Sequence, residues 1–120
     1  MKVTIITIAY NSGTVIGSTI ESVLAQTNRD IEYLIIDGAS KDNTVQIAES
    51  YQEQMIEAGI DFKIYSEPDE GIYDAMNKGI RLATGDIIGI LNSGDQYENV
   101  AVETAIDTFD KTGCELMFGD

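Results

Sequence analysis

The sequence has no histidine and a single cysteine, Cys114. One cysteine excludes a disulfide framework within the chain, and the lack of histidine excludes the usual Cys/His zinc sites. Cys114 stands at the start of the apolar run GCELMF, so we expect a small buried core residue there and not a reactive thiol.

Positive charge is also scarce, with 7 Lys and Arg against 21 Asp and Glu and a net charge of −14. Such an acidic chain repels polyanions, which argues against nucleic acid or an anionic membrane surface as a direct partner. A phosphorylated ligand would be repelled as well unless a divalent cation bridges the two. The charge therefore favours a metal-assisted site, although we expect most of the acids to be solvated on helix faces.

Long apolar runs are missing, and none approaches the length of a membrane span. Met1 and Lys2 lead directly into VTIITIA, which is too short for a secretory leader with a cleavage site. We therefore expect a cytoplasmic location. If the full-length protein associates with a membrane, we expect it at the inner face. The 120 residues, 43% of them apolar, suit one globular domain without linkers or repeats.

Apolar strand-like segments alternate with amphipathic helical segments along the chain. The expected strands are residues 3–9, 31–37, 60–66, 86–91 and a fifth beginning at 115–118. The third strand alternates in polarity, as is typical of a sheet edge. The first expected helix carries Ile16, Ile20, Val23 and Leu24 on one face.

A second single helix is expected after a cap at Asp42 or Ser40, and Gly59 should end it. Its apolar stripe consists of Val45, Ala48, Tyr51 and Met55. The third helix, residues 72–83, should bury Ile72, Ala75, Met76, Gly79 and Ile80. The fourth, residues 100–109, should bury Val102, Ala105, Ile106 and Phe109.

This alternation predicts an α/β fold with a mainly parallel sheet, right-handed crossovers and helices on both faces. Ligands of such sheets bind at the carboxyl ends of the strands, where the strand order reverses. The segments expected at that edge are residues 9–11, 37–38, 66–71 and 92–95.

Asp37, Asp69 and Asp95 lie in these segments. Asp95 stands out because a buried strand precedes it closely and Gly94 frees the backbone to turn. Such a carboxylate suits Mg²⁺ or Mn²⁺, which would take the rest of its ligands from water and a diphosphate. The alternative is that Asp95 caps the helix near Val100. Neither GxxxxGK[ST] nor GxGxxG is present, so a dinucleotide-binding Rossmann domain is not expected.

Four motifs, TIAYNS, DGASKDNT, SEPDEGIYDAMNKGI and ATGDIIGILNSGD, resemble the successive motifs of the family 2 glycosyltransferases. The resemblance covers essentially the whole chain and is greatest to members that assemble bacterial surface polysaccharides. It implies the GT-A fold, in which a Rossmann-like nucleotide-binding half joins an acceptor-binding half. Residues 1–120 would be a single nucleotide-sugar-binding donor half, with the acceptor half absent.

The resemblance also implies the reaction. A sugar would move from a nucleotide-diphosphate donor, with a UDP-sugar favoured, to a hydroxyl of a saccharide or lipid-linked saccharide acceptor. The transfer would invert the anomeric carbon with the help of Mg²⁺ or Mn²⁺, in bacterial polysaccharide or cell-surface glycan synthesis.

Roles for individual residues follow from the same resemblance. Ala9, Tyr10 and Asn11 would line the nucleoside pocket. Asp37 would hydrogen-bond the base, commonly uracil, and Gly38 would let the ligand approach. The next wall would be formed by Asp69, Gly71, Asp74, Asn77 and Lys78, with Lys78 facing either a phosphate or solvent.

The counterpart of the family's Asp-x-Asp element is the run Asn92, Ser93, Gly94 and Asp95. Ser93 stands where the first acid often lies, and Gly94 where a second acid is found in other members. Asp95 is therefore the one direct metal ligand that the resemblance implies. The affinity for the metal is expected to be modest and to depend on the bound diphosphate.

No catalytic base is assigned. Inversion needs a general base near the acceptor hydroxyl, and in this family that base lies beyond position 120. Asp120 is terminal and is not given the role. We expect this chain alone to bind nucleotide weakly and turn over poorly, and its sheet edge beyond the fourth strand to allow pairing into a homo-oligomer.

Two alternatives stay open. One is a nucleotide-binding domain without catalysis. The other is a phospho-acceptor signalling domain, which needs an acidic pair after the first strand and a lysine after the fifth. This chain has Ala-Tyr-Asn and Phe-Gly-Asp at those places.

Overall fold

A computed structural model describes residues 1–112 and 117–119, with side chains to residue 108. The expectations for Cys114, Asp120 and the side chain of Phe109 lie outside these residues. The elements are, in order, β1 Val3–Ala9, α1 Ile16–Leu24, β2 Ile31–Asp37, α2 Thr44–Glu49, α3 Gln52–Ala58, β3 Asp61–Ser66, α4 Ile72–Leu82, β4 Ile87–Ile90, α5 Ala101–Thr112 and β5 Met117–Gly119.

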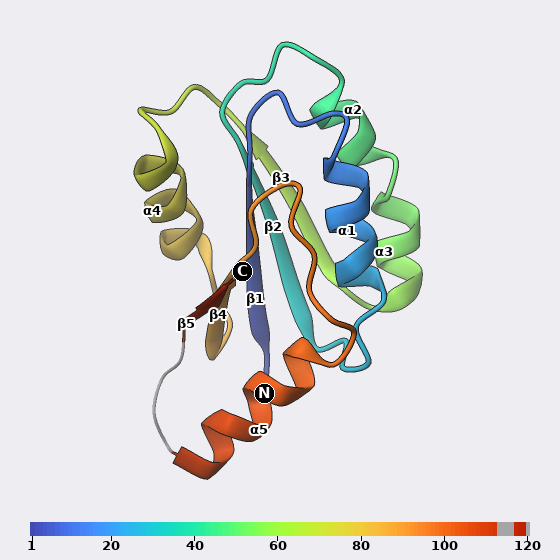
Figure 1. Cartoon of the computed structure of the whole chain (residues 1–120), viewed down its shortest axis with the longest axis vertical. Coiled ribbons are helices and arrows are strands. Elements are labelled where there is room, and N and C mark those ends of the chain that lie inside the picture. Colours follow the sequence, from blue (N-terminus) through green and yellow to red (C-terminus); the bar gives the residue numbers. More distant parts are fainter. Residues whose placement is uncertain (113–116, 120) are drawn as a thin grey trace.

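The five strands form one sheet in the order β3-β2-β1-β4-β5, and every described pairing is parallel. The chain moves outward from β1 to β2 and β3, and then returns to β4 on the other side of β1 (Figure 1). The strand order therefore reverses between β1 and β4. β5 pairs with β4, so the expectation of a free edge beside the fourth strand is wrong.

Helices cover both faces of the sheet (Figure 1). On one face α1, α2, α3 and α5 pack on a core that includes Ile5, Tyr33 and Ile35. On the other face α4 packs on a smaller core around Ile6 and Leu34. The central strands β1 and β2 are almost wholly buried because they are covered on both sides. The expected α/β architecture is confirmed.

The single helix expected between residues 42 and 59 is wrong, because α2 ends at Glu49 and α3 begins at Gln52. Ser50 explains the break. Its hydroxyl donates to the carbonyl of Ile47 at 2.5 Å, and the next N–H, of Tyr51, bonds to Ala48 at 3.1 Å in a tighter turn. Gly59 ends α3 at a φ of 78°, as predicted.

Two further local expectations need correction. Ile72 was expected in the core but is 50% exposed, because the buried stripe of α4 is carried by Ala75 and Gly79. Asp42 lies one residue before the N-cap of α2. Its carboxylate accepts the N–H of Thr44 at 3.0 Å and that of Gly13 at 3.0 Å, so it joins the helix start to the loop after β1. Ser40 does not cap the helix; its hydroxyl bonds to Asp37.

Glu32 is a buried carboxylate at the end of the sheet opposite the expected site. Its side chain is 1% exposed and accepts the N–H of Thr84 at 2.8 Å and the hydroxyls of Thr4 and Thr84 at 2.9 Å. Burial by itself would raise the pKa of Glu32, but these hydrogen bonds and the charge of Lys2 together lower the pKa below its ordinary value. The ionised form is thus the one that the fold stabilises.

Replacing this carboxylate, as in Glu32→Gln, should lower the free energy of unfolding by about 1.5 kcal/mol at pH 7. The amide group cannot accept from every donor that the carboxylate serves. Because the folded pKa lies below the unfolded one, the contribution is complete above about pH 5 and is lost as the pH falls through the folded pKa. Urea unfolding at pH 7 and pH 3.5 should show the difference between wild type and variant shrinking at the lower pH. An equal difference at both pH values would contradict the role of the charge.

Candidate functional site

An open cavity of about 500 Å³ lies at the carboxyl ends of the strands. The loops after β1, β2 and β3 form it. Its lining residues are Ile8, Ala9, Tyr10, Gly38, Pro68, Asp69, Gly71 and Ile72. Five of these, Ala9, Tyr10, Gly38, Asp69 and Gly71, are residues that the sequence places at a donor site. Their convergence follows from the parallel sheet, which brings successive strand ends to one edge.

The apolar part of this lining was missed by the sequence argument. Ile8 is a strand residue, and Ile72 was assigned to the core. Ile72 is exposed in the first turn of α4, directly after Gly71, whose φ is 117°. Its position directly after the motif glycine Gly71, at the start of the helix, is the signal that could have identified it. Tyr10 adds an aromatic side chain, and the residue is 59% exposed.

Asn11 ties two loops together. Its backbone N–H donates to the Ser40 hydroxyl at 2.7 Å, and its Oδ1 accepts the N–H of Lys41 at 2.8 Å. Its φ of 48° is in the left-handed region, which asparagine tolerates better than most residues. Asn11 thus fixes the loop that carries Tyr10, and it is not among the residues that line the cavity.

Asp37 is fully buried at the end of β2. Its carboxylate accepts the N–H of Ser40 at 2.9 Å, the Ser40 hydroxyl at 2.5 Å and the Ser66 hydroxyl at 2.8 Å. The carboxylate is therefore turned into the protein, where it joins the β2 loop to the end of β3. Its contact with a base stays a prediction, since such a contact would need one of these donors to be replaced. Neither serine was identified as a partner from the sequence.

Asp69 is the carboxylate that the structure does bring into the cavity. A Cβ added at Gly38 would lie 2.9 Å from Oδ2 of Asp69, so the missing side chain is what allows this close approach. Oδ1 of Asp69 accepts the N–H of Gly71 at 3.1 Å. Among the described residues, no hydrogen-bond donor reaches Oδ2, which is available to a ligand.

The other predicted wall residues do not line the cavity. Oδ2 of Asp74 accepts the N–H of Glu70 at 2.9 Å, which fixes the start of α4. The ammonium group of Lys78 contacts the connection between β3 and α4. Asn77 is exposed on α4, and its side chain makes no hydrogen bond within the described part of the chain.

The turn at residues 92–95 follows β4, which lies on the other side of β1 from β2 and β3. The N–H of Asp95 bonds to the carbonyl of Asn92 at 3.0 Å, and Gly94 has a φ of 96°. The hydroxyl of Thr19 accepts from the N–H of Gly94 at 2.9 Å and donates to the carbonyl of Asp95 at 2.8 Å. The hydroxyls of Ser93 and Ser12 are 2.8 Å apart. Helix α1 and the β1 loop thus hold the turn in place.

The chemistry of this turn fits a hard cation. Within the described chain no donor reaches the Asp95 carboxylate, and Oδ1 of Asn92 is buried without a hydrogen-bond partner. Carboxylate and amide oxygens are ligands that Mg²⁺ and Mn²⁺ accept. No group of three or more His, Cys, Asp or Glu able to hold a metal occurs among the described residues. Other ligands would have to come from water or a bound molecule.

The alternative role of Asp95 as a helix cap is not observed. Helix α5 begins at Ala101, and the N–H of that residue bonds to the carbonyl of Glu98 at 3.0 Å. No side-chain bond from Asp95 to this helix start occurs in the described part of the chain.

Comparison with known families gives a match to the model of "Glycosyl transferase family 2" over residues 4–120. A PGL/p-HBAD biosynthesis glycosyltransferase of Mycobacterium bovis is 31% identical over 112 residues, which cover 92% of this chain and 43% of that protein. An uncharacterized glycosyltransferase of Mycobacterium tuberculosis is 41% identical over 96 residues, which cover 79% of this chain and 34% of that protein. The chain therefore spans less than half the length of these relatives.

Solved structures give the same fold. S. aureus TarS 1–349 in complex with UDP-GlcNAc superposes with a TM-score of 0.85 at 23% identity, over 94% of this chain and 32% of that one. The mannosyltransferase PcManGT from Pyrobaculum calidifontis, in complex with GDP-Man and Mn²⁺, gives a TM-score of 0.81 at 23% identity, over 89% and 32% of the two chains. The GT-A fold that the sequence motifs imply is confirmed. No described helix combines the length and apolar character required to cross a bilayer.

Proposed function

The chain belongs to glycosyl transferase family 2, and from this membership we propose that it binds the nucleotide-sugar donor of an enzyme that transfers a sugar to an acceptor hydroxyl. The observation that carries the proposal is the cavity at the strand ends, where Tyr10, Gly38 and Asp69 meet. The turn that holds Asp95 is attached to the same strand end, because the N–H of Ser93 bonds at 3.3 Å to the carbonyl of Ile8, which lines the cavity. The UDP-GlcNAc bound to TarS and the GDP-Man and Mn²⁺ bound to PcManGT support a nucleotide sugar as the ligand.

We assign the nucleoside to this cavity. Tyr10 offers an exposed ring on which a base can stack, and Oδ2 of Asp69 can accept an N–H from the base. Gly38 and Gly71 leave the approach to Asp69 open. A uracil is the favoured base, and the half-buried carboxylate of Asp69 is the group that would accept its N–H.

We assign the diphosphate to the neighbouring turn. A chain with a net charge of −14 needs a cation to bring a diphosphate close, and Asp95 with Oδ1 of Asn92 would hold Mg²⁺ or Mn²⁺ there. When bound, the metal would neutralise the negative charge that develops on the leaving nucleoside diphosphate. The protein's own part is to fix this turn through Thr19 and Ser12 before the ligand arrives.

The transfer is proposed to invert the anomeric carbon. Inversion needs a general base at the acceptor hydroxyl, and no residue of this chain is assigned that role. The acceptor is proposed to be a saccharide or lipid-linked saccharide of a bacterial cell surface, handled on the cytoplasmic side of the membrane. A relative named for PGL/p-HBAD biosynthesis supports a surface-glycan role.

The test is calorimetric titration of the chain with UDP, GDP and dTDP, each with and without Mn²⁺. We expect one nucleotide to bind more tightly than the others. Gly38→Ala should weaken its binding about 10-fold, because the new Cβ meets the Asp69 carboxylate at 2.9 Å. Gly17→Ala is the matched control, since a Cβ there meets only the Tyr51 hydroxyl at 3.4 Å.

Three results would count against the proposal. A folded chain that binds none of the nucleotides contradicts the donor site. Equal binding by Gly38→Ala and wild type contradicts its placement in this cavity. A longer protein that binds nucleotide but neither transfers nor hydrolyses a sugar would instead be a nucleotide-binding domain without catalysis.

A further inference from the structure

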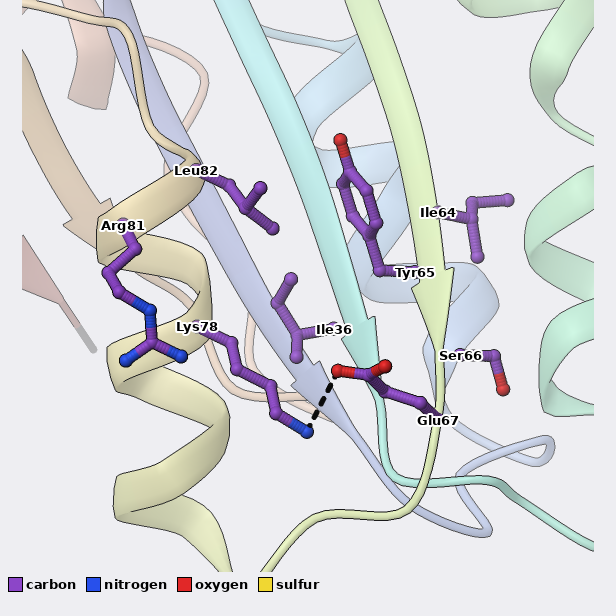
Figure 2. Close-up of a pocket in the computed structure, with 8 residues that line it drawn as sticks. All are labelled: Ile36, Ile64, Tyr65, Ser66, Glu67, Lys78, Arg81 and Leu82. Carbon is purple, nitrogen blue, oxygen red and sulfur yellow. Dashed lines mark ion pairs between the residues drawn. The ribbon is translucent and has the colours of Figure 1, made fainter.

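A second cavity, of about 450 Å³, lies between α4 and β3 on the α4 face of the sheet (Figure 2). Ile36, Tyr65 and Leu82 give it an apolar floor, and Lys78, Glu67 and Arg81 supply its charged groups. Lys78 lines this cavity and not the candidate donor cavity. The lysine for which the family resemblance left either a phosphate or solvent as its neighbour therefore faces a different space.

The ammonium group of Lys78 is engaged within the protein. Nζ donates to the carbonyl of Pro68 at 3.1 Å, lies 3.1 Å from Oε1 of Glu67 and lies 3.7 Å from Oδ2 of Asp74. Figure 2 shows the side chain extending from α4 toward Glu67 at the end of β3. The lysine side chain is only 16% exposed.

These contacts hold the middle of a loop that has few other attachments. The N–H of Glu67 bonds to the carbonyl of Asp37 at 3.0 Å and continues the strand pairing, and the N–H of Glu70 bonds to Asp74 at the start of α4. Between these two points stands Pro68, which has no N–H to donate. Its carbonyl is bound by Lys78, so the lysine joins the loop to the helix.

The loop held in this way carries Asp69, whose carboxylate lies against Gly38. A Cβ added at Gly38 would lie 2.9 Å from Oδ2 of Asp69. We propose that Lys78 is a positioning residue, which fixes the Glu67–Gly71 loop so that the Asp69 carboxylate stays at the edge of the nucleoside cavity. The inference rests on the proposed function, because it assigns Lys78 a part in donor binding through Asp69. It replaces direct contact with a phosphate.

The charges around Lys78 agree with this role. Burial by itself would lower the pKa of Lys78, but the hydrogen bond to Glu67 and the charges of Glu67, Asp74 and Asp69 together raise it. An ammonium group already paired with carboxylates has less to offer an incoming diphosphate than a free one. The same pairing makes it effective at holding the loop.

The experiment compares uridine with UDP as ligands of wild type, Lys78→Met, Lys78→Arg and Arg81→Met. Lys78→Met keeps the apolar stem and removes the ammonium. Arg81→Met removes the same charge one turn away, from a residue that lines the same cavity but makes no hydrogen bond or ion pair with the loop among the described residues. Backbone hydrogen exchange at Glu70 and Gly71, in protein without nucleotide, reports the loop directly, and circular dichroism confirms that each variant is folded.

We expect Lys78→Met to weaken uridine and UDP by the same factor, about 10-fold, and to speed exchange at Glu70 and Gly71 by a similar factor. Lys78→Arg should restore most of the nucleotide affinity and most of the protection from exchange. Arg81→Met should change neither the affinity nor the exchange rate. Loss of UDP affinity with uridine unchanged would overturn the proposal in favour of phosphate contact. Unchanged exchange in Lys78→Met would overturn it whether or not nucleotide binds, whereas a wild type that binds neither ligand refutes the proposed function alone.

Discussion

Asp95→Asn should abolish the effect of Mn²⁺ on UDP binding. The carboxylate is the one acid of the 92–95 turn, and its backbone is fixed by Thr19 on α1. Without its charge, the cation would keep only neutral protein ligands in this turn. We expect the affinity for UDP in Mn²⁺ to fall about 100-fold, to the level measured without metal, with no change in the metal-free affinity.

Calorimetry with and without Mn²⁺ measures this difference, and the electron paramagnetic resonance signal of free Mn²⁺ checks it without any turnover. Asp107→Asn is the control, because this exposed acid on α5 gives the same change in net charge far from the turn. If Asp95→Asn and wild type respond equally to Mn²⁺, the metal is not held by this turn. Asp95 would then be a half-buried residue of a well-fixed loop without a metal-binding role.

Much of the fold was predictable because its strands have simple patterns. Residues 3–9 and 31–37 are nearly continuous apolar runs, and such runs have few stable places other than the centre of a covered parallel sheet. The alternating third strand was correctly placed at an edge. The break between α2 and α3 was not predictable from the apolar stripe, because Ala48, Tyr51 and Met55 continue at helical spacing across it. The break depends on a local hydrogen bond from the Ser50 hydroxyl to the backbone. The spacing of the apolar residues carries no information about that bond.

In the candidate site, the positions of the residues were predictable from the sequence, but the directions of their side chains were not. The sequence brought Tyr10, Gly38 and Asp69 to one place, because a parallel sheet collects the residues that follow its strands. It could not show that Asp37 turns inward, since that direction is set by Ser66 at the end of a neighbouring strand. Nor could it show where Lys78 points, because its partners lie on a loop whose path depends on the packing of α4. Residue position follows from topology, whereas side-chain direction depends on tertiary neighbours.

The close approach of α4 to the sheet at Gly79 gives the largest expected effect on stability. A Cβ added at Gly79 would lie 2.6 Å from Cγ2 and 2.9 Å from Cδ1 of Ile6, a fully buried residue of β1. Because Cγ2 is attached directly to the Ile6 Cβ, it has little freedom to move aside. The helix can be this close to the strand only because residue 79 has no side chain.

Gly79→Val should therefore lower the free energy of unfolding by about 3 kcal/mol, and the melting temperature by roughly 10 °C. Intrinsic helix propensity predicts the opposite sign, since valine is favoured over glycine in a helix by a few tenths of a kcal/mol. The steric cost should win because the core around Ile6 is closely packed. Asn77→Val, at an exposed position of the same helix, tests the effect of valine without the clash and should stay within about 0.5 kcal/mol of wild type. Urea unfolding of both variants decides the point, and a Gly79→Val midpoint equal to that of Asn77→Val would contradict the close contact between α4 and β1.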